Sequence, residues 1–436
     1  MAKIIPFRGT CYNKALFREM NALFAPPYDV VNAEERDKIA GQSPYNIFHL
    51  ELPSIRDCKD EAADKYDCAA RLMKNWFAEK VIVKDNLPSV YPYDIEFEAD
   101  GSRFTRKGLV CLLRTEDWST GTVLPHERTF EQVTVDRLKL RMATRAQFSQ
   151  IFMLYRHQVE LDELLGNAPR ESMFQAKDGQ GCIHTIQRIS ASPYVDKICR
   201  SFRDMHVYIA DGHHRYTTAI KYRKEMAARF GPDPDAPYNF TMVYLVDVQD
   251  PGMIVLPTHR LVNMPPEMNC QDVLEKLSRF FHLEELDQPS GAEGVSQAVA
   301  FRKRLSESCS NGITLMFGLR KRAFVLCPRD DARRILLEAV GHRELAELDV
   351  VVLEELVFKR GLGIDPERLQ AGRDIFYMAD SEDAVRCLEK HQMLFFMHPT
   401  PVEQVLDVAD AGLAMPHKST YFFPKILTGM VLNVEE

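Results

Sequence analysis

The run from Asp211 to Arg215 carries the strongest chemical signal in the sequence. It follows a short apolar run, His206 to Ala210, and precedes a helical pattern from Tyr216 to Phe230, which predicts a strand, a tight turn and a helix. The glycine at this turn allows close backbone approach, and the first amides of a helix lack partners within it. Together with Arg215, these groups are typical of an anion-binding site. From spacing alone, a plain turn with surface histidines is an equally weighted alternative.

A second candidate is the tripeptide Pro125-His126-Glu127. A carboxylate here is suited to take a proton from a hydroxyl group, and equally suited to hold Mg²⁺. Standing alone, Glu127 would more often be a surface carboxylate beside a solvated Arg128.

Three arginines lie four residues apart within a helical pattern from Val135 to Ala146, namely Arg137, Arg141 and Arg145. This spacing predicts that they share one helix face. Such a face lines an acidic-ligand cleft in some proteins, but a solvated charged face is the more common outcome.

Further polar residues stand in predicted loops, from which side chains often reach a site. Asp29 follows a proline pair, and Arg260 comes after an apolar strand from Met253 to Leu256. Lys418 and Lys425 stand among aromatic residues late in the chain. Each is compatible with a binding role or with a corner that the fold needs for packing.

The order of these motifs resembles the DUF1015 family of bacterial and archaeal proteins over almost the whole chain. The matching segments are residues 5–9, 25–30, 43–46, 121–129, 136–144, 151–155, 208–219, 256–262 and 415–429. The chain differs from the family pattern at Gln150, where proline is expected, and at His417, where glutamine is expected.

The middle of the chain is similar to the ParB/sulfiredoxin superfamily and, within it, to the free serine kinases. Those kinases carry a D-G-x-H-R motif that cradles nucleotide phosphates and an upstream P-H-E motif whose glutamate acts on the serine hydroxyl. The resemblance implies a base at Glu127 and a catalytic or Mg²⁺-orienting acid at Asp211. It implies a phosphate cradle formed by Gly212, His213, His214 and Arg215.

The same resemblance implies a nucleotide (ADP or ATP) and Mg²⁺ as cofactors, and L-serine as the favoured small-molecule substrate. Candidates for contacts to that substrate are His126, Arg137, Arg141, Arg260, Asp29 and Lys418. Two relatives are excluded. Sulfiredoxins need a cysteine where this chain has His213, and DNA-partitioning ParB proteins need a basic surface.

Composition agrees with that exclusion. The chain has 436 residues, 45% of them hydrophobic, and a net charge of −8, which disfavours nucleic acid as the main partner. The ten cysteines form no C-x-x-C pair, and neither a signal-peptide pattern nor an apolar run of membrane-spanning length is visible. We therefore expect a cytoplasmic protein without a membrane partner, and leave a homo-oligomer open.

The alternation of helical and strand patterns predicts an α/β to α+β, multi-layer mixed fold around a central ParB/sulfiredoxin-like nucleotide-binding unit. The expected parts are an N-terminal α/β segment (1–109), the catalytic unit (110–262), an α+β segment (263–340) and a C-terminal α/β segment packing on the core (341–436). Expected elements include helices at 60–80, 271–281 and 295–308, a hairpin of strands 90–97 and 104–113, and strands at 240–248, 313–317 and 323–327.

Three functions are compatible with these motifs. A small-molecule kinase would use both the cradle and Glu127, whereas a nucleotide-switched binding or regulatory protein would need only the cradle. A phosphohydrolase of a small phosphorylated metabolite would use the same residues with water as the nucleophile. Serine phosphorylation by a nucleotide would favour the first, and phosphate release without nucleotide the third.

Overall fold

The computed structural model describes residues 1–435 apart from 56–63, 100, 130, 191–192, 287–312, 318–321, 366–368 and 370–371. Within these ranges the chain has a mixed α/β fold, which confirms the predicted fold class. It divides into two compact units. The first unit comprises Met1–Pro125, Thr129–Ile254 and Pro424–Glu436, and the second comprises His126–Arg128 and Val255–Phe423.

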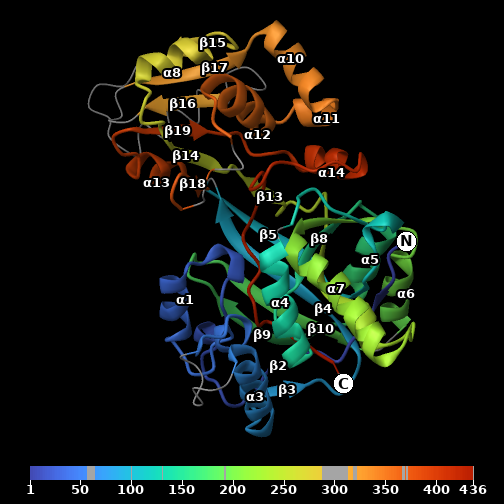
Figure 1. Ribbon diagram of the computed structural model, residues 1–436. Helices are drawn as coiled ribbons and strands as arrows, with labels where there is room; N and C mark the ends of the chain where they lie inside the picture. The colour runs from blue at the N-terminus through green and yellow to red at the C-terminus, as the bar shows by residue number, and fades with distance from the viewer. Residues whose placement is uncertain are drawn as a thin grey trace. The chain divides into compact units, whose positions relative to one another are not determined.

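A nine-stranded mixed sheet forms the centre of the first unit, in the order β6-β11-β8-β12-β5-β4-β10-β9 with β1 paired to β5 (Figure 1). The strands are β1 (Ile4–Ile5), β4 (Ser89–Ala99), β5 (Ser102–Arg114), β6 (Val123–Leu124), β8 (Ile151–Tyr155), β9 (Glu171–Lys177), β10 (Ile183–Ser190), β11 (Val207–Asp211) and β12 (Phe240–Asp247). β8 runs parallel to β12 and antiparallel to β11. The edge of the sheet where β11 ends is therefore the edge where β8 begins.

The two central strands β8 and β12 are buried along their whole length. Their apolar residues alternate between the two faces, and Val243 and Leu245 share a core with Leu161 and Ile198 of the covering helices. A strand buried on both faces needs a nearly continuous apolar run, which is why the segment 240–248 was predictable.

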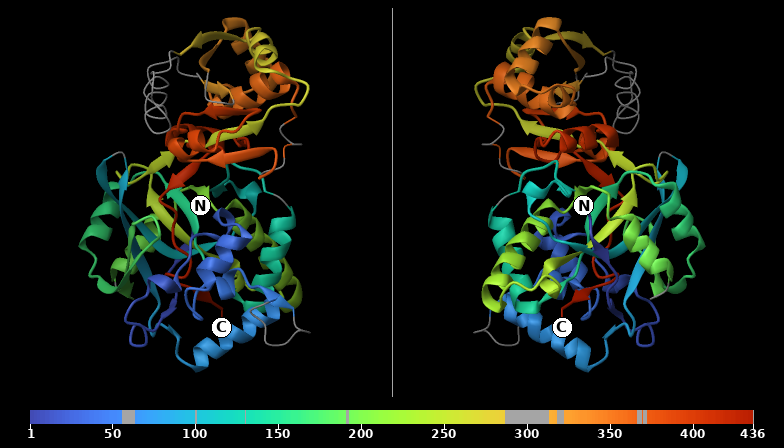
Figure 2. Two further views of the ribbon diagram at one scale, coloured as in Figure 1. Left: turned by 90° about the vertical axis from the view of Figure 1, so that its left-hand side faces the viewer. Right: turned by 90° about the vertical axis from the view of Figure 1, so that its right-hand side faces the viewer.

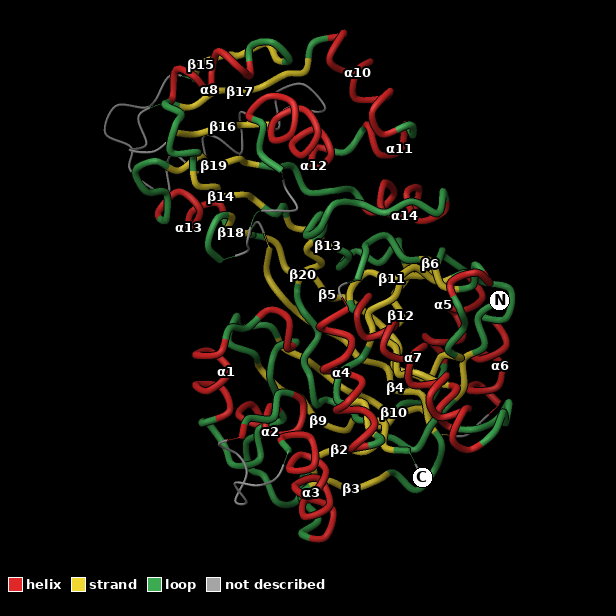
Figure 3. Tube along the Cα trace, in the orientation of Figure 1, coloured by secondary structure: helices red, strands yellow, loops and turns green. Residues whose placement is uncertain are grey.

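The helical segments of the first unit surround this sheet. They are η1 (Asn21–Leu23), η2 (Tyr28–Val30), α1 (Ala33–Ala40), α2 (Phe48–Glu51), α3 (Lys65–Ala78), η4 (Trp118–Thr120), α4 (Glu131–Thr144), α5 (Val159–Asn167), α6 (Pro193–Ser201), α7 (His213–Phe230) and η5 (Pro237–Asn239). α3 packs on α4, and α4 packs on α7 (Figure 3). Leu138 and Met142 of α4 contact the cluster around Tyr222 and Met226 of α7.

The C-terminal residues return to the first unit beside its N-terminal segments (Figure 2). Thr10 forms a β-bridge with Leu432, and β21 (Asn433–Val434) pairs with β7 (Ala146–Gln147). A further small pair joins β2 (Thr10–Tyr12) to β3 (Ile82–Lys84). These contacts fix the last residues of the chain against the unit that carries α4 and α7.

The second unit contains a six-stranded sheet in the order β15-β17-β16-β19-β14-β18. Its strands are β14 (His259–Asn263), β15 (Phe281–Glu285), β16 (Ile313–Phe317), β17 (Ala323–Pro328), β18 (Ile375–Met378) and β19 (Gln392–Phe396), and a separate pair joins β13 (Ile254–Leu256) to β20 (Tyr421–Phe423). The helices are α8 (Cys270–Leu277), α10 (Asp330–Val340), α11 (Arg343–Ala346), α12 (Asp349–Val352), the π-helical η7 (Leu353–Leu362), α13 (Ser381–Arg386) and α14 (Val402–Asp410). Leu261, Leu394 and Ala384 contribute to its core.

Most elements expected from the sequence are confirmed, with shifted ends. The hairpin is β4 with β5. The helix expected over 60–80 begins at Lys65, and the one expected over 271–281 ends at Leu277. The helix expected over 295–308 lies outside the described residues.

The four segments expected from the sequence are not tested by the division into two units and stay a prediction. The boundary at 109/110 falls inside β5, and the boundary at 262/263 falls inside β14.

None of the helices in the described ranges combines the length and the apolar composition that a bilayer crossing requires.

The close approach of β5 to the ring of Tyr244 generates a stability prediction. A Cβ at Gly108 would lie 2.1 Å from Tyr244 Cε2, and Tyr244 is fully buried, so Gly108→Ala must displace packed atoms. We expect urea denaturation to show a loss of about 1–3 kcal/mol in the free energy of unfolding. Gly166→Ala is the control, because its Cβ would meet nothing within 4 Å. Equal stability of the two variants would contradict the described packing.

Candidate functional site

The candidate site is built on the turn between β11 and α7, in the first unit. Gly212 is the N-cap of α7 and adopts a left-handed conformation, with φ +100° and ψ 31°. A Cβ at this position would lie 2.8 Å from Nε of Arg215. Glycine is therefore required both by the backbone conformation and by the neighbouring arginine.

The first turn of α7 is suited to an anion. Gly212 supplies no side-chain cap, and the first turn, all of which is described, carries no acidic residue. Its amides point along the helix axis with the positive end of the helix dipole. The helix begins at His213, three residues before the predicted Tyr216, so the two histidines belong to this turn. His213 is buried and His214 is half-buried.

Arg215 lies beside this turn, with its side chain 9% exposed. Its guanidinium donates to the carbonyl of Gln150 and, at 3.3 Å, to Oδ1 of Asp211. Nε has no hydrogen-bond partner among the described residues. Burial opposes the charge, but the carboxylates of Asp211 and Asp29 outweigh it and raise the pKa of Arg215. Arg215 therefore stays charged, and its Nε is a buried donor.

Asp211 lies between two cationic groups. Its Oδ2 accepts a 2.7 Å hydrogen bond from Nζ of Lys425, and its Oδ1 faces Arg215. Lys425 comes from the C-terminal segment of the same unit. From the sequence, Lys425 was only one of several polar residues that stand among aromatic residues near the end of the chain. No local pattern around Lys425 indicated that it pairs with Asp211.

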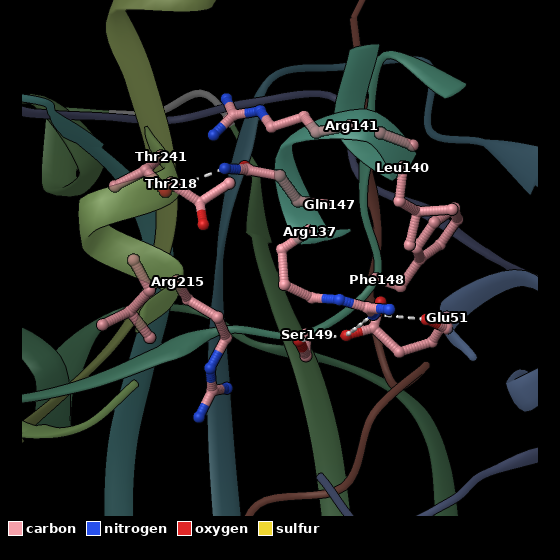
Figure 4. Close-up of a pocket in the computed structure, with 12 residues that line it drawn as sticks. Glu51, Arg137, Leu140, Arg141, Gln147, Phe148, Ser149, Arg215, Thr218 and Thr241 are labelled. Atoms are coloured by element: carbon pink, nitrogen blue, oxygen red, sulfur yellow. Dashed lines mark hydrogen bonds and ion pairs between the residues drawn. The ribbon is translucent and has the colours of Figure 1, made fainter. Parts of the chain in front are cut away.

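A small pocket lies next to Arg215, with a cavity of about 60 Å³ (Figure 4). Its polar lining includes Glu51, Arg137, Arg141, Ser149 and Arg215. Figure 4 shows Arg137 pointing toward Glu51 and Ser149, whereas Arg141 points away from them. The cavity has room for a few water molecules but is far too small for a nucleotide.

Arg137 is buried rather than solvated. It is 7% exposed, donates to the carbonyl of Glu51 and to the carboxylate of Asp136, and lies 4.7 Å from the ring centre of Tyr28. Burial raises the pKa of Glu51, which Arg137 and the Ser149 hydroxyl partly offset. Glu51 was not predicted from the sequence, because it lies in a short helix without a motif.

Arg141 is also buried, at 6% exposure, so Arg137 and Arg141 do not form the solvated face that was the more common alternative for this spacing. It donates to the carbonyl of Phe240 and, at 3.2 Å, to Oε1 of Glu435, and its Nε has no partner among the described residues. Arg145 does not share this face. α4 ends at Thr144, and Arg145 is exposed with φ +50°, its guanidinium over the ring of Phe230.

Asp29 belongs to the first unit as well. It lies exposed in the short helix η2, and its charge acts on Arg215 and on Glu51. The first unit therefore holds the predicted residues Asp29, Arg137, Arg141, Asp211, Gly212, His213, His214 and Arg215.

The remaining predicted residues belong to the second unit, where they lie close together. Oε1 of Glu127 is 2.7 Å from Nδ1 of His417 and accepts from the amide of Lys418 at 3.3 Å. The carbonyl of Lys418 accepts from buried Arg260, and burial lowers the pKa of Arg260 to about 10. Buried His126 lies 3.3 Å from Oγ1 of Thr420.

Comparisons with known proteins point to one family. The model of the family described as "Protein of unknown function (DUF1015)" matches residues 4–351. No curated protein matches the chain in sequence.

Solved structures resemble the chain only distantly. A free serine kinase in complex with AMP is 12% identical with a TM-score of 0.32, over 71% of this chain and 89% of the kinase. SbnI from Staphylococcus aureus, with a C-terminal truncation, is 11% identical with a TM-score of 0.34, over 73% of this chain and 85% of SbnI. A conserved hypothetical protein from Pyrococcus furiosus is 12% identical with a TM-score of 0.30, over 71% and 92% of the two chains. Similarity this low does not transfer a residue's role, and the wider ParB/sulfiredoxin relationship stays a prediction.

The contacts that hold Arg137 beside the pocket generate a pH prediction. Asp136 accepts from Lys65 at 2.9 Å and from the hydroxyl of Tyr66 at 2.6 Å. Burial acts to raise the pKa of Asp136, but the charge of Arg137 and the Tyr66 hydrogen bond outweigh it and hold the pKa below its ordinary value. A lowered pKa contributes stability above the unfolded-state pKa of about 3.9, and that stability is lost as the pH falls through the folded-state pKa.

We therefore expect Asp136→Asn to lower the free energy of unfolding at pH 7 and to lower it progressively less below about pH 4. Urea denaturation of the variant and the native protein at several pH values measures this difference. Asp204→Asn, at an exposed position, is the control. A difference that stays constant down to pH 2 would contradict the proposed charge contacts.

Proposed function

This chain belongs to the DUF1015 family, and we propose that it binds a nucleotide by its phosphates at the first turn of α7 and transfers a phosphoryl group to a small hydroxyl compound. L-Serine is the favoured acceptor. The observation that carries the nucleotide part is the left-handed Gly212, which begins an uncapped helix directly beside the buried Arg215.

The electrostatics of this turn support a phosphate ligand. The first amides of α7, to which Gly212 gives no side-chain cap, carry a partial positive charge, and Nε of Arg215 is a charged donor. Lys425 places a second cation at Asp211. Asp211 offsets part of this positive charge. Its hydrogen bonds also hold Arg215 and Lys425 in place, so a phosphate group would meet cations whose positions are already fixed.

The residues at this turn fit Mg²⁺ poorly. Both carboxylate oxygens of Asp211 contact cationic groups, Arg215 at 3.3 Å and Lys425 at 2.7 Å. A metal ion would have to replace at least one of them. Mg²⁺ at Asp211 stays a prediction, and we assign Asp211 the role of holding Arg215 and Lys425 in place.

Phosphoryl transfer to serine rests on the resemblance of the two motifs to the free serine kinases. In the proposed reaction the acceptor oxygen bonds to the terminal phosphorus, the bond from that phosphorus to the nucleotide breaks, and the hydroxyl proton moves to Glu127. Nδ1 of His417 lies 2.7 Å from Oε1 of Glu127, the oxygen of the proposed base. Arg137 and Arg141 have most of their donors engaged by protein groups, so a role in binding the acceptor carboxylate also stays a prediction.

Nucleotide binding is tested by calorimetry with ADP, ATP and adenosine. We expect ADP and ATP to bind and adenosine, which lacks phosphates, to bind at least about 10-fold more weakly, a difference of about 1.4 kcal/mol. Gly212→Ala should weaken ADP binding by a similar factor, because its Cβ would displace Arg215. Gly179→Ala is the matched control, since its Cβ would meet nothing within 4 Å. Adenosine binding as tight as ADP binding would exclude recognition through the phosphates.

Catalysis is tested by ³¹P NMR of the protein with ATP or ADP and serine. We expect phosphoserine to form, and Glu127→Gln to slow its formation by roughly 10²-fold or more, as for loss of a general base. Glu131→Gln, at an exposed position of α4, should retain the full rate. Nucleotide binding without any transfer would instead favour a nucleotide-switched binding protein, and phosphate release from a phosphorylated metabolite without nucleotide would favour a phosphohydrolase.

A further inference from the structure

A second group of side chains lies in the first unit, at the edge of the sheet opposite the α7 turn. β8 and β12 run parallel, with Tyr155 in register with Asp247, so their carboxyl ends lie side by side. His157 follows β8 by two residues, and Asp247 is the last residue of β12. The α7 turn follows β11, which is antiparallel to β8, and therefore lies at the other edge.

Three of these side chains offer ligand atoms at metal-binding distances. One ligand atom each from His157, Asp162 and Asp247 lies within 4.8 Å of the other two. Bonds of about 2.0–2.2 Å from an ion to N or O ligands place neighbouring ligand atoms roughly 3–4.4 Å apart. The three groups are thus already close to the arrangement that an ion requires.

The arrangement is held by the fold. Asp247 is 7% exposed, and its Oδ1 accepts from the amide of Gln249 at 2.8 Å. Its Oδ2 lies 2.6 Å from Nδ1 of His157, whose side chain is 30% exposed. Asp162 reaches the group from the first turn of α5. An ion bound here would replace the direct contact between Oδ2 of Asp247 and Nδ1 of His157, while the Gln249 amide would keep the carboxylate oriented.

The three side chains also line a large cavity of about 630 Å³. Asp94, Asp250 and Tyr155 line the same cavity. Tyr155 is only 4% exposed and contributes to the lining of this cavity.

We propose that His157, Asp162 and Asp247 bind a divalent transition-metal ion of the Mn²⁺ or Zn²⁺ type at the mouth of this cavity. An imidazole nitrogen with two carboxylates suits such ions better than Ca²⁺ or Mg²⁺, which prefer all-oxygen sites. Three protein ligands leave further coordination positions open toward the cavity, for water or a small molecule. The hydroxyl of Tyr155 would donate a hydrogen bond to a group bound there.

The test is a titration of Mn²⁺ with the full-length, tag-free protein in the absence of nucleotide, followed by the electron paramagnetic resonance of free Mn²⁺. We expect one Mn²⁺ to bind per chain, with Zn²⁺ displacing it. Asp247→Asn and His157→Ala should each weaken binding by at least about 10-fold. Asp162→Asn, an exposed substitution that leaves the core untouched, should also weaken it, which keeps the test decisive if the first two variants fold poorly.

Asp196→Asn, at an exposed position of α6, is the matched control and should bind Mn²⁺ like the native protein. A free Mn²⁺ signal that persists in excess protein, with no heat from Zn²⁺ in calorimetry, would overturn the proposal. So would undiminished binding by Asp162→Asn. Because no nucleotide or α7 residue takes part, failure here leaves the proposed nucleotide site untouched, and failure of nucleotide binding leaves this site untouched.

Discussion

The candidate site depends on the backbone at Gly212. A φ of +100° at this residue turns the chain from β11 into α7 within one position, and the missing Cβ lets Arg215 fold back to within contact of the turn. Any other side chain would strain the backbone and collide with the guanidinium. The helix start at His213, the buried charge of Arg215 and the position of Asp211 all follow from this one conformation.

Paired charges hold the surrounding segments around this turn. Lys425 and Glu435, both near the end of the chain, contact Asp211 and Arg141. Such partly buried pairs add little net stability, because desolvation offsets much of their attraction. The main effect of these pairs is to hold chain segments in position. They fix the C-terminal segment against α4 and α7, and so hold Lys425 at Asp211 beside the first turn of α7.

Patterns among neighbouring residues predicted the secondary structure that neighbouring residues determine. The strand, turn and helix around Gly212 follow from hydrophobic periodicity and from the conformational freedom of glycine, and they were found with an error of three residues at the helix start. Arg145 does not share the helix face that its spacing predicted, because α4 ends one residue earlier. Contacts such as Lys425 with Asp211, or His157 with Asp247, arise from strand pairing between distant segments, which a single sequence does not encode in any local pattern.

The proposed function and the proposed metal site place two chemistries at opposite edges of one sheet, the phosphate cradle where β11 ends and the metal where β8 and β12 end. The phosphate cradle is the central claim. A crystal structure of the protein with ADP tests it most directly. The account predicts phosphate oxygens within hydrogen-bond distance of the amides of His213 and His214 and of Nε of Arg215. Nucleotide density elsewhere, with the first turn of α7 contacting only water, would contradict it.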